Sequence, residues 1–140
     1  MSNIFDLRLK NEEISQEAEQ LVIASLIYES NAIFRVNELL TGDMFESPVN
    51  RLIYNCIENL SNNTQHIDML SVSNLLRNEQ VFIDAGGIVY LSRLSGLIAT
   101  TIHLEDWADI IFDTYINRRI MLMSVKFYES ARMCHSSGAD

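Results

Sequence analysis

The stretch that decides the fold covers residues 103–133, HLEDWADIIFDTYINRRIMLMSVKFYESARM. It contains neither Pro nor Gly, and apolar side chains recur along it at the spacing of an α-helix. A helix of about thirty residues is roughly 45 Å long at 1.5 Å per residue, which is more than a small domain needs to cover its core. We therefore predict one long helix over residues 102–133 that projects from a smaller helical body.

The apolar stripe of this long helix needs a covering surface. A second helix is predicted over residues 88–97, so that the two helices form a protruding antiparallel hairpin. Such a hairpin buries its apolar face either on the rest of the chain or on a partner chain, and the pattern leaves both possibilities open. The candidate residues for this core or interface are Tyr90, Leu91, Leu94, Leu97, Trp107, Ile111 and Tyr115.

Local helix signals fill the region before the hairpin. Helices are predicted over residues 16–28 and 31–40, with Gly42 ending the second. Ser47-Pro48 indicates the start of a third helix, because Ser is a good N-cap and Pro fits the first helical position. Asp68 is predicted to cap a fourth helix. One Pro and five Gly in the whole chain agree with this pattern, so the predicted fold class is all-α.

The domain organisation follows from these helices. Residues 1–14 are predicted as a flexible N-terminal arm. Residues 15–101 form a small helical globule that includes the first hairpin helix, and residues 102–133 form the long second one. The polar residues 134–140 are predicted to begin a linker to a further domain.

The net charge of the chain limits the classes of partner that it is expected to bind. Ten Lys and Arg against nineteen Asp and Glu leave a formal net charge of -9. This balance disfavours a sequence-independent grip on phosphates and favours protein partners. The sequence has no apolar run long enough to span a membrane and no secretory signal, and it carries only two isolated cysteines, Cys56 and Cys134. We therefore expect a cytoplasmic protein without direct nucleic-acid or membrane binding.

Catalytic patterns are missing from the sequence. No G-x-x-x-x-G-K-[ST] loop occurs, and Gly86-Gly87, followed by Ile88, is interpreted as a turn before a helix rather than as a phosphate site. We predict no catalytic residue, no cofactor-binding residue and no metal site. Acidic residues near the start of the long helix are interpreted as compensating its dipole rather than as metal ligands: Glu105, Asp106, Asp109 and Asp113.

Two further charged pairs have competing interpretations. Glu17 and Glu19 are two residues apart, so they do not share a helix face, and we interpret them as the charged start of a helix. Arg118-Arg119 is the only adjacent basic pair. It lies either on a solvated face, where it compensates the helix dipole, or in contact with an acidic partner surface.

Several short motifs follow one another in a distinctive order. They are Glu17-Ala18-Glu19-Gln20, Leu26-Ile27, Asp43-Met44-Phe45, Arg51-Leu52-Ile53-Tyr54, Asp68 with Ser71-Val72, Gly86-Gly87-Ile88-Val89-Tyr90-Leu91, and Trp107-Ala108 with Ile110-Ile111 and Arg118-Arg119. In this order and spacing the chain resembles the N-terminal domain of bacterial replicative DNA helicases of the DnaB type, over roughly residues 15–120. The signature residues that the resemblance marks as structural are Glu17, Glu19, Phe45, Asp68, Gly86, Gly87 and Arg119.

The chain departs from the family pattern at three positions. Ala24 stands where the family usually has Gly, and Asn50 stands where it has His. His103 replaces the Asn before the long helix, so Thr101 is a second candidate for the N-cap. These departures suggest a divergent member, such as one from a phage, plasmid or mobile element.

The resemblance implies a function in DNA replication. In this family the helical hairpins pair between subunits, so that the full-length hexamer carries a collar built as a trimer of dimers. The collar docks primase and, in some systems, a helicase loader. The DNA-binding, ATP-hydrolysing motor, which requires ATP and Mg²⁺, is expected downstream of this chain. The alternative is a free-standing helical adaptor or phage-type modulator of a host helicase, and a reading frame that continues past Asp140 into a Walker loop would discriminate against it.

Overall fold

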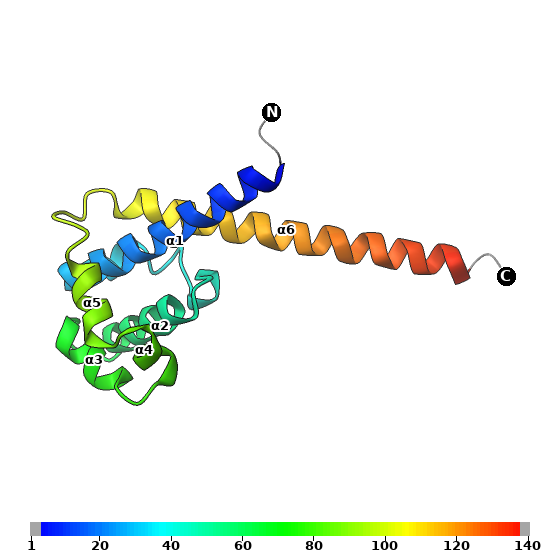
Figure 1. Cartoon of the computed structure of the whole chain (residues 1–140). Helices are drawn as coiled ribbons and strands as arrows, with labels where there is room; N and C mark the ends of the chain where they lie inside the picture. Colours follow the sequence, from blue (N-terminus) through cyan, green and yellow to red (C-terminus); the bar gives the residue numbers. More distant parts are fainter. Residues whose placement is uncertain (1–3, 138–140) are drawn as a thin grey trace.

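Helices are the only regular secondary structure in residues 4–137, which are the residues that the computed structural model describes. A small body of short helices carries one long helix that extends far beyond it (Figure 1). This arrangement confirms the predicted all-α class. The elements in order are α1 (Ile4–Tyr28), η1 (Ser30–Arg35), η2 (Gly42–Met44), α2 (Pro48–Asn62), α3 (Met69–Leu76), α4 (Gln80–Ala85), α5 (Ile88–Ser95) and α6 (Leu104–Ser137), where η denotes a 3₁₀-helix.

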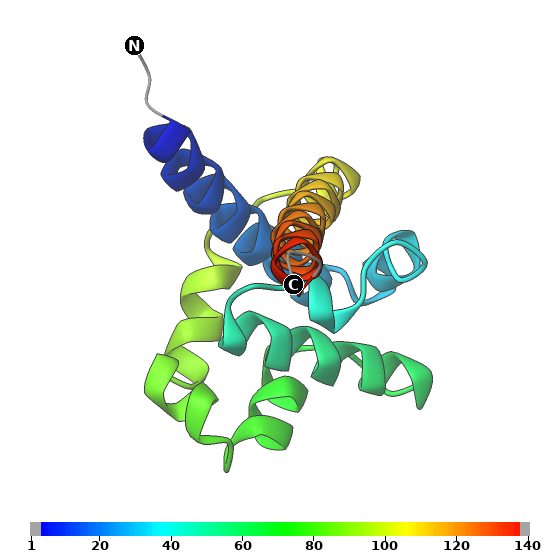
Figure 2. The ribbon, with the colours of Figure 1, turned by 90° about the vertical axis from the view of Figure 1, so that its right-hand side faces the viewer.

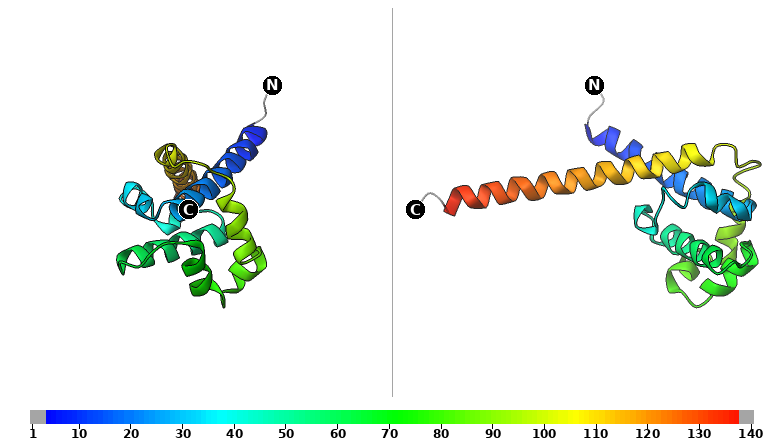
Figure 3. Two further views of the ribbon diagram at one scale, coloured as in Figure 1. Left: turned by 90° about the vertical axis from the view of Figure 1, so that its left-hand side faces the viewer. Right: turned by 180° about the vertical axis from the view of Figure 1, so that it is seen from behind.

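Helix α1 is the central element of the packing. α6 and α5 both pack against it, and α2 packs against α1 on one side and against α3 and α4 on the other. α1 and α6 run in roughly opposite directions, as Figures 1 and 3 show from opposite sides. Figure 2 looks along α6 from its C-terminal end and shows α2 to α5 gathered on one side of it. The short α5 and the long α6 are therefore joined in sequence and held together through α1.

The core lies where α1, α2 and α5 meet. Val22, Ile23 and Leu26 of α1 are fully buried, as are Ile53 and Ile57 of α2. These positions recur at intervals of three and four residues, so each helix presents one apolar face to the others. Burying several large aliphatic side chains in this way is the main stabilising contribution available to a body of this size.

The first helix begins much earlier than predicted. α1 starts at Ile4 rather than near residue 16, so residues 4–14 are helical and the prediction of a flexible arm over 1–14 is wrong for them; residues 1–3 lie outside the described residues. Ser15 has the chemistry of an N-cap but is buried inside the helix. No Gly or Pro interrupts the sequence upstream of it, so nothing stops the helix there.

The second predicted helix is not an α-helix. Residues 30–35 form the 3₁₀-helix η1, and the chain then continues through turns as far as Leu40. Ile33, Val36 and Leu40 are all buried. Their spacing of three and four residues fits successive tight turns as well as an α-helix, so periodicity alone does not separate the two.

Gly42 begins η2 instead of ending a helix. A Cβ atom at this position would lie 2.0 Å from Oδ1 of Asn55 in α2. A side chain at this position would therefore require the Asn55 amide to move aside.

Other local signals lie where they were predicted. Pro48 is the first residue of α2, and Asp68 caps α3 by accepting a hydrogen bond from the backbone N–H of Ser71 at 2.7 Å. Gly86 and Gly87 have φ angles of +117° and +58° and form the turn before α5. α6 runs to Ser137, four residues past the predicted end of the long helix at 133, and residues 138–140 lie outside the described residues. The linker to a further domain stays a prediction.

Candidate assembly surface and the contacts that orient it

Helix α6 consists of two parts with different surroundings. In residues 104–118 one face packs on the body of the domain, and Leu104, Ala108 and Ile111 are almost completely buried. We use the term globule for α1 to α5 together with residues 104–118, and the term tail for residues 119–135. The boundary lies at Arg118, whose guanidinium Nη1 forms an ion pair with Glu46 Oε2 at 3.0 Å. Beyond this ion pair α6 leaves the globule.

The tail exposes apolar side chains on every side. All residues from 119 to 135 are exposed. Among them are Ile120, Met121, Leu122, Met123, Val125, Phe127, Tyr128 and Met133, with exposed fractions between 49% and 71%. So many exposed large apolar side chains on one segment are typical of a protein interaction site. The tail is therefore the candidate assembly surface of the domain.

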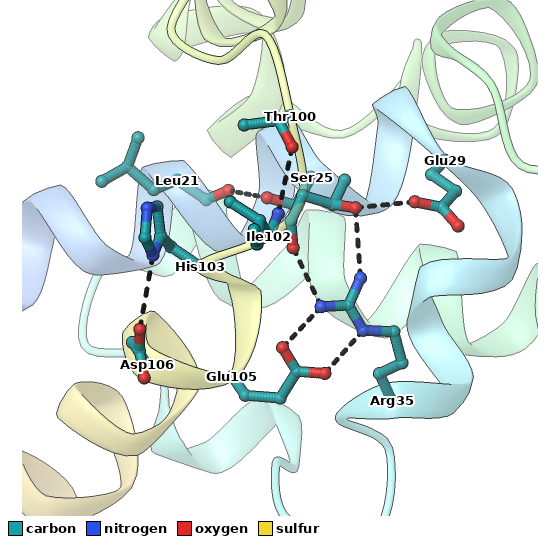
Figure 4. Close-up of polar contacts among 10 residues, drawn as sticks. Leu21, Ser25, Glu29, Arg35, Thr100, Ile102, His103, Glu105 and Asp106 are labelled. Carbon is teal, nitrogen blue, oxygen red and sulfur yellow. Dashed lines mark hydrogen bonds and ion pairs between the residues drawn. The ribbon is translucent and has the colours of Figure 1, made fainter.

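The start of α6 is anchored to η1 through Arg35 (Figure 4). Its guanidinium donates from Nε to Glu105 Oε1 at 2.6 Å and from Nη2 to Glu105 Oε2 at 2.5 Å. This two-pronged pairing fixes the geometry of both groups and holds the pKa of the Glu105 carboxyl below its usual range. The same guanidinium donates from Nη2 to the carbonyl oxygen of Thr101 at 2.9 Å. Arg35 therefore ties the connection between α5 and α6 to an element about 70 residues earlier.

Thr101 does not cap α6, contrary to one expectation from the sequence. Its hydroxyl accepts a hydrogen bond from Arg35 Nη1 at 3.1 Å and donates one to Glu29 Oε2 at 2.7 Å. The first helical hydrogen bond of α6 runs from the N–H of Trp107 to the carbonyl oxygen of His103 at 3.1 Å. The side chain of Thr101 therefore joins the anchor around Arg35, and His103 takes the N-cap position.

Glu19 has a role that the sequence interpretation missed. It lies in the middle of α1, not at a helix start, and its side chain is completely buried. One carboxylate oxygen accepts a hydrogen bond from the N–H of Glu46 and the other from the N–H of Ser47, both at 3.1 Å. Glu19 therefore caps the N-terminus of α2. It takes the place of the Ser47 side chain, which makes no capping hydrogen bond.

The surroundings of Glu19 include two further polar groups. Asn50 Nδ2 donates to Glu19 Oε1 at 3.4 Å, and Tyr90 Oη donates to Asn50 Oδ1 at 2.6 Å, so α1, α2 and α5 are joined at one point. Burial raises the pKa of Glu19, and the hydrogen bonds that its carboxylate accepts oppose this shift. A signal for this role was present, since Glu19 shares the apolar face of α1 with Val22 and Ile23.

The predicted core or interface residues divide into groups in the structure. Tyr90, Leu91, Leu94 and Ile111 are buried in the core of this chain. Trp107 and Tyr115 are half-buried, and Leu97 is 47% exposed. Four of the seven are therefore occupied by contacts within the chain.

The residues that the family resemblance marks as structural lie in different environments. Phe45 is buried and stacks on Tyr54, with ring centroids 4.7 Å apart. Asp68, Gly86 and Gly87 form the cap and the turn described above. Glu17 and Arg119 are exposed, and of the basic pair only Arg118 makes an ion pair with Glu46.

No group of three or more His, Cys, Asp or Glu side chains in the described part of the chain is arranged so that it could hold a metal ion. None of the helices described is both long and apolar enough to cross a membrane.

Comparisons with known proteins assign the chain to a family. The model of the DnaB-like helicase N terminal domain matches residues 11–113. The chain belongs to this family. It is 30% identical over 105 residues to the replicative DNA helicase DnaB of Synechocystis sp., an alignment that covers 75% of this chain and 12% of the relative. It is 28% identical over 121 residues to the replicative DNA helicase DnaC of Bacillus subtilis, covering 86% and 26%. The chain thus spans a minor part of these relatives.

Solved structures of DnaB-type domains have the same fold. The N-terminal domain of DnaB helicase from Mycobacterium tuberculosis superposes with a TM-score of 0.74 at 24% identity, covering 80% of both chains. The N-terminal domain from Helicobacter pylori, described together with its interactions with primase, also gives 0.74, at 19% identity over 89% of this chain and 97% of that one. At these identities the likeness concerns the fold.

Proposed function

We propose that this chain is the N-terminal assembly and partner-docking domain of a replicative DNA helicase. The full-length protein unwinds DNA at the replication fork, and its ATP- and Mg²⁺-dependent motor lies outside this chain. The domain itself carries no catalysis. The cytoplasm, where replication takes place, is part of the same proposal.

The exposed tail is the observation that carries the assembly part of the proposal. Its large apolar side chains are 49–71% exposed, whereas Leu104, Ala108 and Ile111 on the same helix are almost completely buried. Burying them between copies would stabilise an assembly through the hydrophobic effect. We propose that two domains pair through this region and that three such pairs form the collar of a hexamer.

The docking part of the proposal concerns primase, with a helicase loader as a further partner. Its support comes from relatives, because the Helicobacter pylori domain and a DnaB-like replicative helicase of the same fold were both described with their interactions with primase. The net charge of -9 on this chain is consistent with binding to proteins rather than to DNA.

Self-association is the first test. Sedimentation velocity from roughly 1 µM to several hundred µM is expected to show a shift from monomer to dimer or a larger closed assembly, because association of moderate affinity lies in this range. A strict monomer at the highest concentration contradicts the assembly proposal.

Primase binding is the second test. Titration of a bacterial primase into the chain, followed by calorimetry, is expected to give saturable binding. Binding to an intact DnaB-type helicase in the absence of any primase binding would instead favour the adaptor or modulator hypothesis.

A further inference from the structure

The segment that connects η2 to α2, residues 45–47, is held in place by the buried carboxylate of Glu19. We use the term connector for this segment. Outside a helix, backbone N–H groups need acceptors from other parts of the chain. The N–H groups of the last two connector residues each donate to one oxygen of Glu19, both at 3.1 Å. Arg51 Nη2 donates to the carbonyl oxygen of Phe45, the first connector residue, at 2.9 Å. The connector backbone is therefore bound at each of its residues.

The position of the Glu19 carboxylate is itself set by the core. Its side chain is completely buried. Asn50 Nδ2 donates to its Oε1 at 3.4 Å, and Tyr90 Oη of α5 donates to Asn50 Oδ1 at 2.6 Å. A buried carboxylate in a connected network of hydrogen bonds has few alternative positions. Glu19 therefore holds the connector in one place relative to α1, α2 and α5.

Glu46, the middle residue of the connector, links this network to α6. Its N–H donates to Glu19, and its carboxylate Oε2 forms the ion pair with Arg118 Nη1 at 3.0 Å. Ion pairs between partly exposed side chains are weak, in part because two long side chains lose conformational freedom. Since the backbone of Glu46 is already fixed, less freedom remains to be lost. Glu19 therefore favours the ion pair through the connector.

Arg118 is well placed to control the direction of the tail. Ile111 is the last buried residue of α6 up to residue 135, and Arg118 lies about 10 Å beyond it at 1.5 Å per residue. A contact at this distance resists tilting of the helix about its buried part. The tail is about 25 Å long, so a tilt of about 10° at Arg118 would move its far end by about 4 Å. The ion pair therefore contributes little to stability but has a large effect on where the tail points.

We infer that Glu19 is a positioning residue for the tail of α6, which acts through the backbone of Glu46 and the ion pair between Glu46 and Arg118. The buried junction of α1, α2 and α5 is thereby coupled to the direction in which the tail leaves the globule. This coupling is a property of the single chain and does not depend on association. Only its consequence, that the candidate assembly surface is presented in one orientation, rests on the proposed function.

Single-molecule FRET measures the direction of the tail in folded molecules. One dye is attached to Cys134, which is exposed near the end of α6, and the other to a cysteine introduced by Asn62→Cys at the exposed end of α2. Cys56 is buried and is replaced by Ala in every chain compared. A labelled chain at roughly 0.1 nM is far more dilute than association of moderate affinity requires, so single chains are observed. Unfolded molecules form a separate population and do not affect the peak of the folded ones.

Arg118→Met removes the ion pair and is expected to shift the mean distance between the dyes by about 4 Å and to broaden the peak. Arg118→Lys keeps a cation within reach of Glu46 and is expected to stay at the wild-type mean. Glu19→Gln keeps the volume of the side chain but puts an amide NH₂ group where a backbone N–H needs an acceptor. It is expected to reproduce at least about half of the shift of Arg118→Met. The double variant is expected to match Arg118→Met alone, because both changes interrupt the same path.

Amide hydrogen exchange reports on the connector directly. In Glu19→Gln the N–H groups of Glu46 and Ser47 are expected to exchange at least about tenfold faster than in the wild type, because they lose an acceptor. In Arg118→Met, which acts further along the path, the same groups are expected to change by less than about threefold. Glu17→Gln is the matched control, since it makes the same change at an exposed position of the same helix and is expected to alter neither measurement.

A purely structural role of Glu19 would lower the stability of the domain and leave the tail of the folded molecules in its wild-type direction. A wild-type FRET peak in folded Glu19→Gln therefore overturns the inference, and so does a wild-type peak in Arg118→Met. If Glu19→Gln does not fold, Glu19→Asp replaces it. Its carboxylate is one bond too short to reach both N–H groups, so it is expected to shift the peak in the same direction, and an unshifted peak overturns the inference. A wild-type chain that stays monomeric in sedimentation refutes the assembly proposal alone, because the FRET measurement is made on single chains.

Discussion

On a single helix, Ile111 is 1% exposed and Phe127 is 67% exposed, although both are large apolar residues. Ile111 belongs to the globule, where α6 packs on α1 and is held by Arg35 at its start and by Glu46 at its end. Phe127 belongs to the tail, in which every residue from 119 to 135 is exposed. The backbone hydrogen bonds are the same in both parts, because each forms within four residues of the same helix.

The difference teaches that helix formation and tertiary stabilisation are separate in this molecule. Local hydrogen bonds continue α6 to Ser137, although residues 119–135 are all exposed. Isolated helical segments of this length are only marginally stable in water. We therefore expect substitutions in the globule to act on the free energy of unfolding and substitutions in the tail to act on association.

The largest effect is expected for Ile111→Ala. Removal of a buried aliphatic side chain from the α1–α6 contact should lower the free energy of unfolding by about 2–5 kcal/mol. Urea denaturation followed by circular dichroism measures this. Ile120→Ala in the tail is the matched control, expected to change the stability of the monomer by less than about 0.5 kcal/mol. Equal losses in both variants would abolish the distinction between the two parts of α6.

Glu19→Ala is expected to lower the free energy of unfolding by about 2–3 kcal/mol. The substitution leaves the N–H groups of Glu46 and Ser47 without their acceptor, and a buried unsatisfied group costs about 1–3 kcal/mol. The control is Glu17→Ala on the same helix, where the side chain is exposed and a change below about 0.5 kcal/mol is expected. A loss no greater than that of Glu17→Ala would show that Glu19 does not cap α2.

Asp68→Ala should have a smaller, pH-dependent effect of about 1 kcal/mol near neutral pH. The N–H of Ser71 lowers the pKa of Asp68 below its ordinary value of 3.8. A lowered pKa in the folded state means that this stabilisation is present above pH 3.8 and is lost as the pH falls through the folded-state pKa. Denaturation at pH 7 and pH 3 measures the change. Asp68→Asn retains a capping oxygen, so it should stay close to the wild type at pH 7.

The smallest effect on unfolding is expected for Tyr128→Asp in the tail. Its side chain is 70% exposed, so the stability of the monomer should change by less than about 0.5 kcal/mol. Its association should nevertheless weaken, because the substitution puts a charge into the proposed interface. Urea denaturation at low protein concentration measures the stability of the monomer, and sedimentation over a range of protein concentrations measures association. A large loss in the free energy of unfolding at low protein concentration would show that Tyr128 stabilises the fold of the monomer rather than the assembly.

Predictions that depend on a few neighbouring residues succeeded. The cap at Asp68 and the turn at Gly86-Gly87 rest on side chains and backbone within one helical turn. α2 starts at Pro48 as predicted, although the side chain of Ser47 makes no capping hydrogen bond. The predicted start of α1 and the α-helix over residues 31–40 failed. In the first case a capping residue lies inside a helix, and in the second the apolar spacing also fits tight turns.

The sequence by itself determined the all-helical class, the long final helix and the family, because helix signals and motif order are local or linear properties. Only the tertiary structure decided that Glu19 accepts hydrogen bonds from Glu46 and Ser47, 27 and 28 residues away, and that Arg35 anchors Glu105, 70 residues away. It also decided which part of the apolar stripe on α6 is covered. The physical reason is that periodicity shows which residues share a helix face, whereas burial depends on which other element packs against that face.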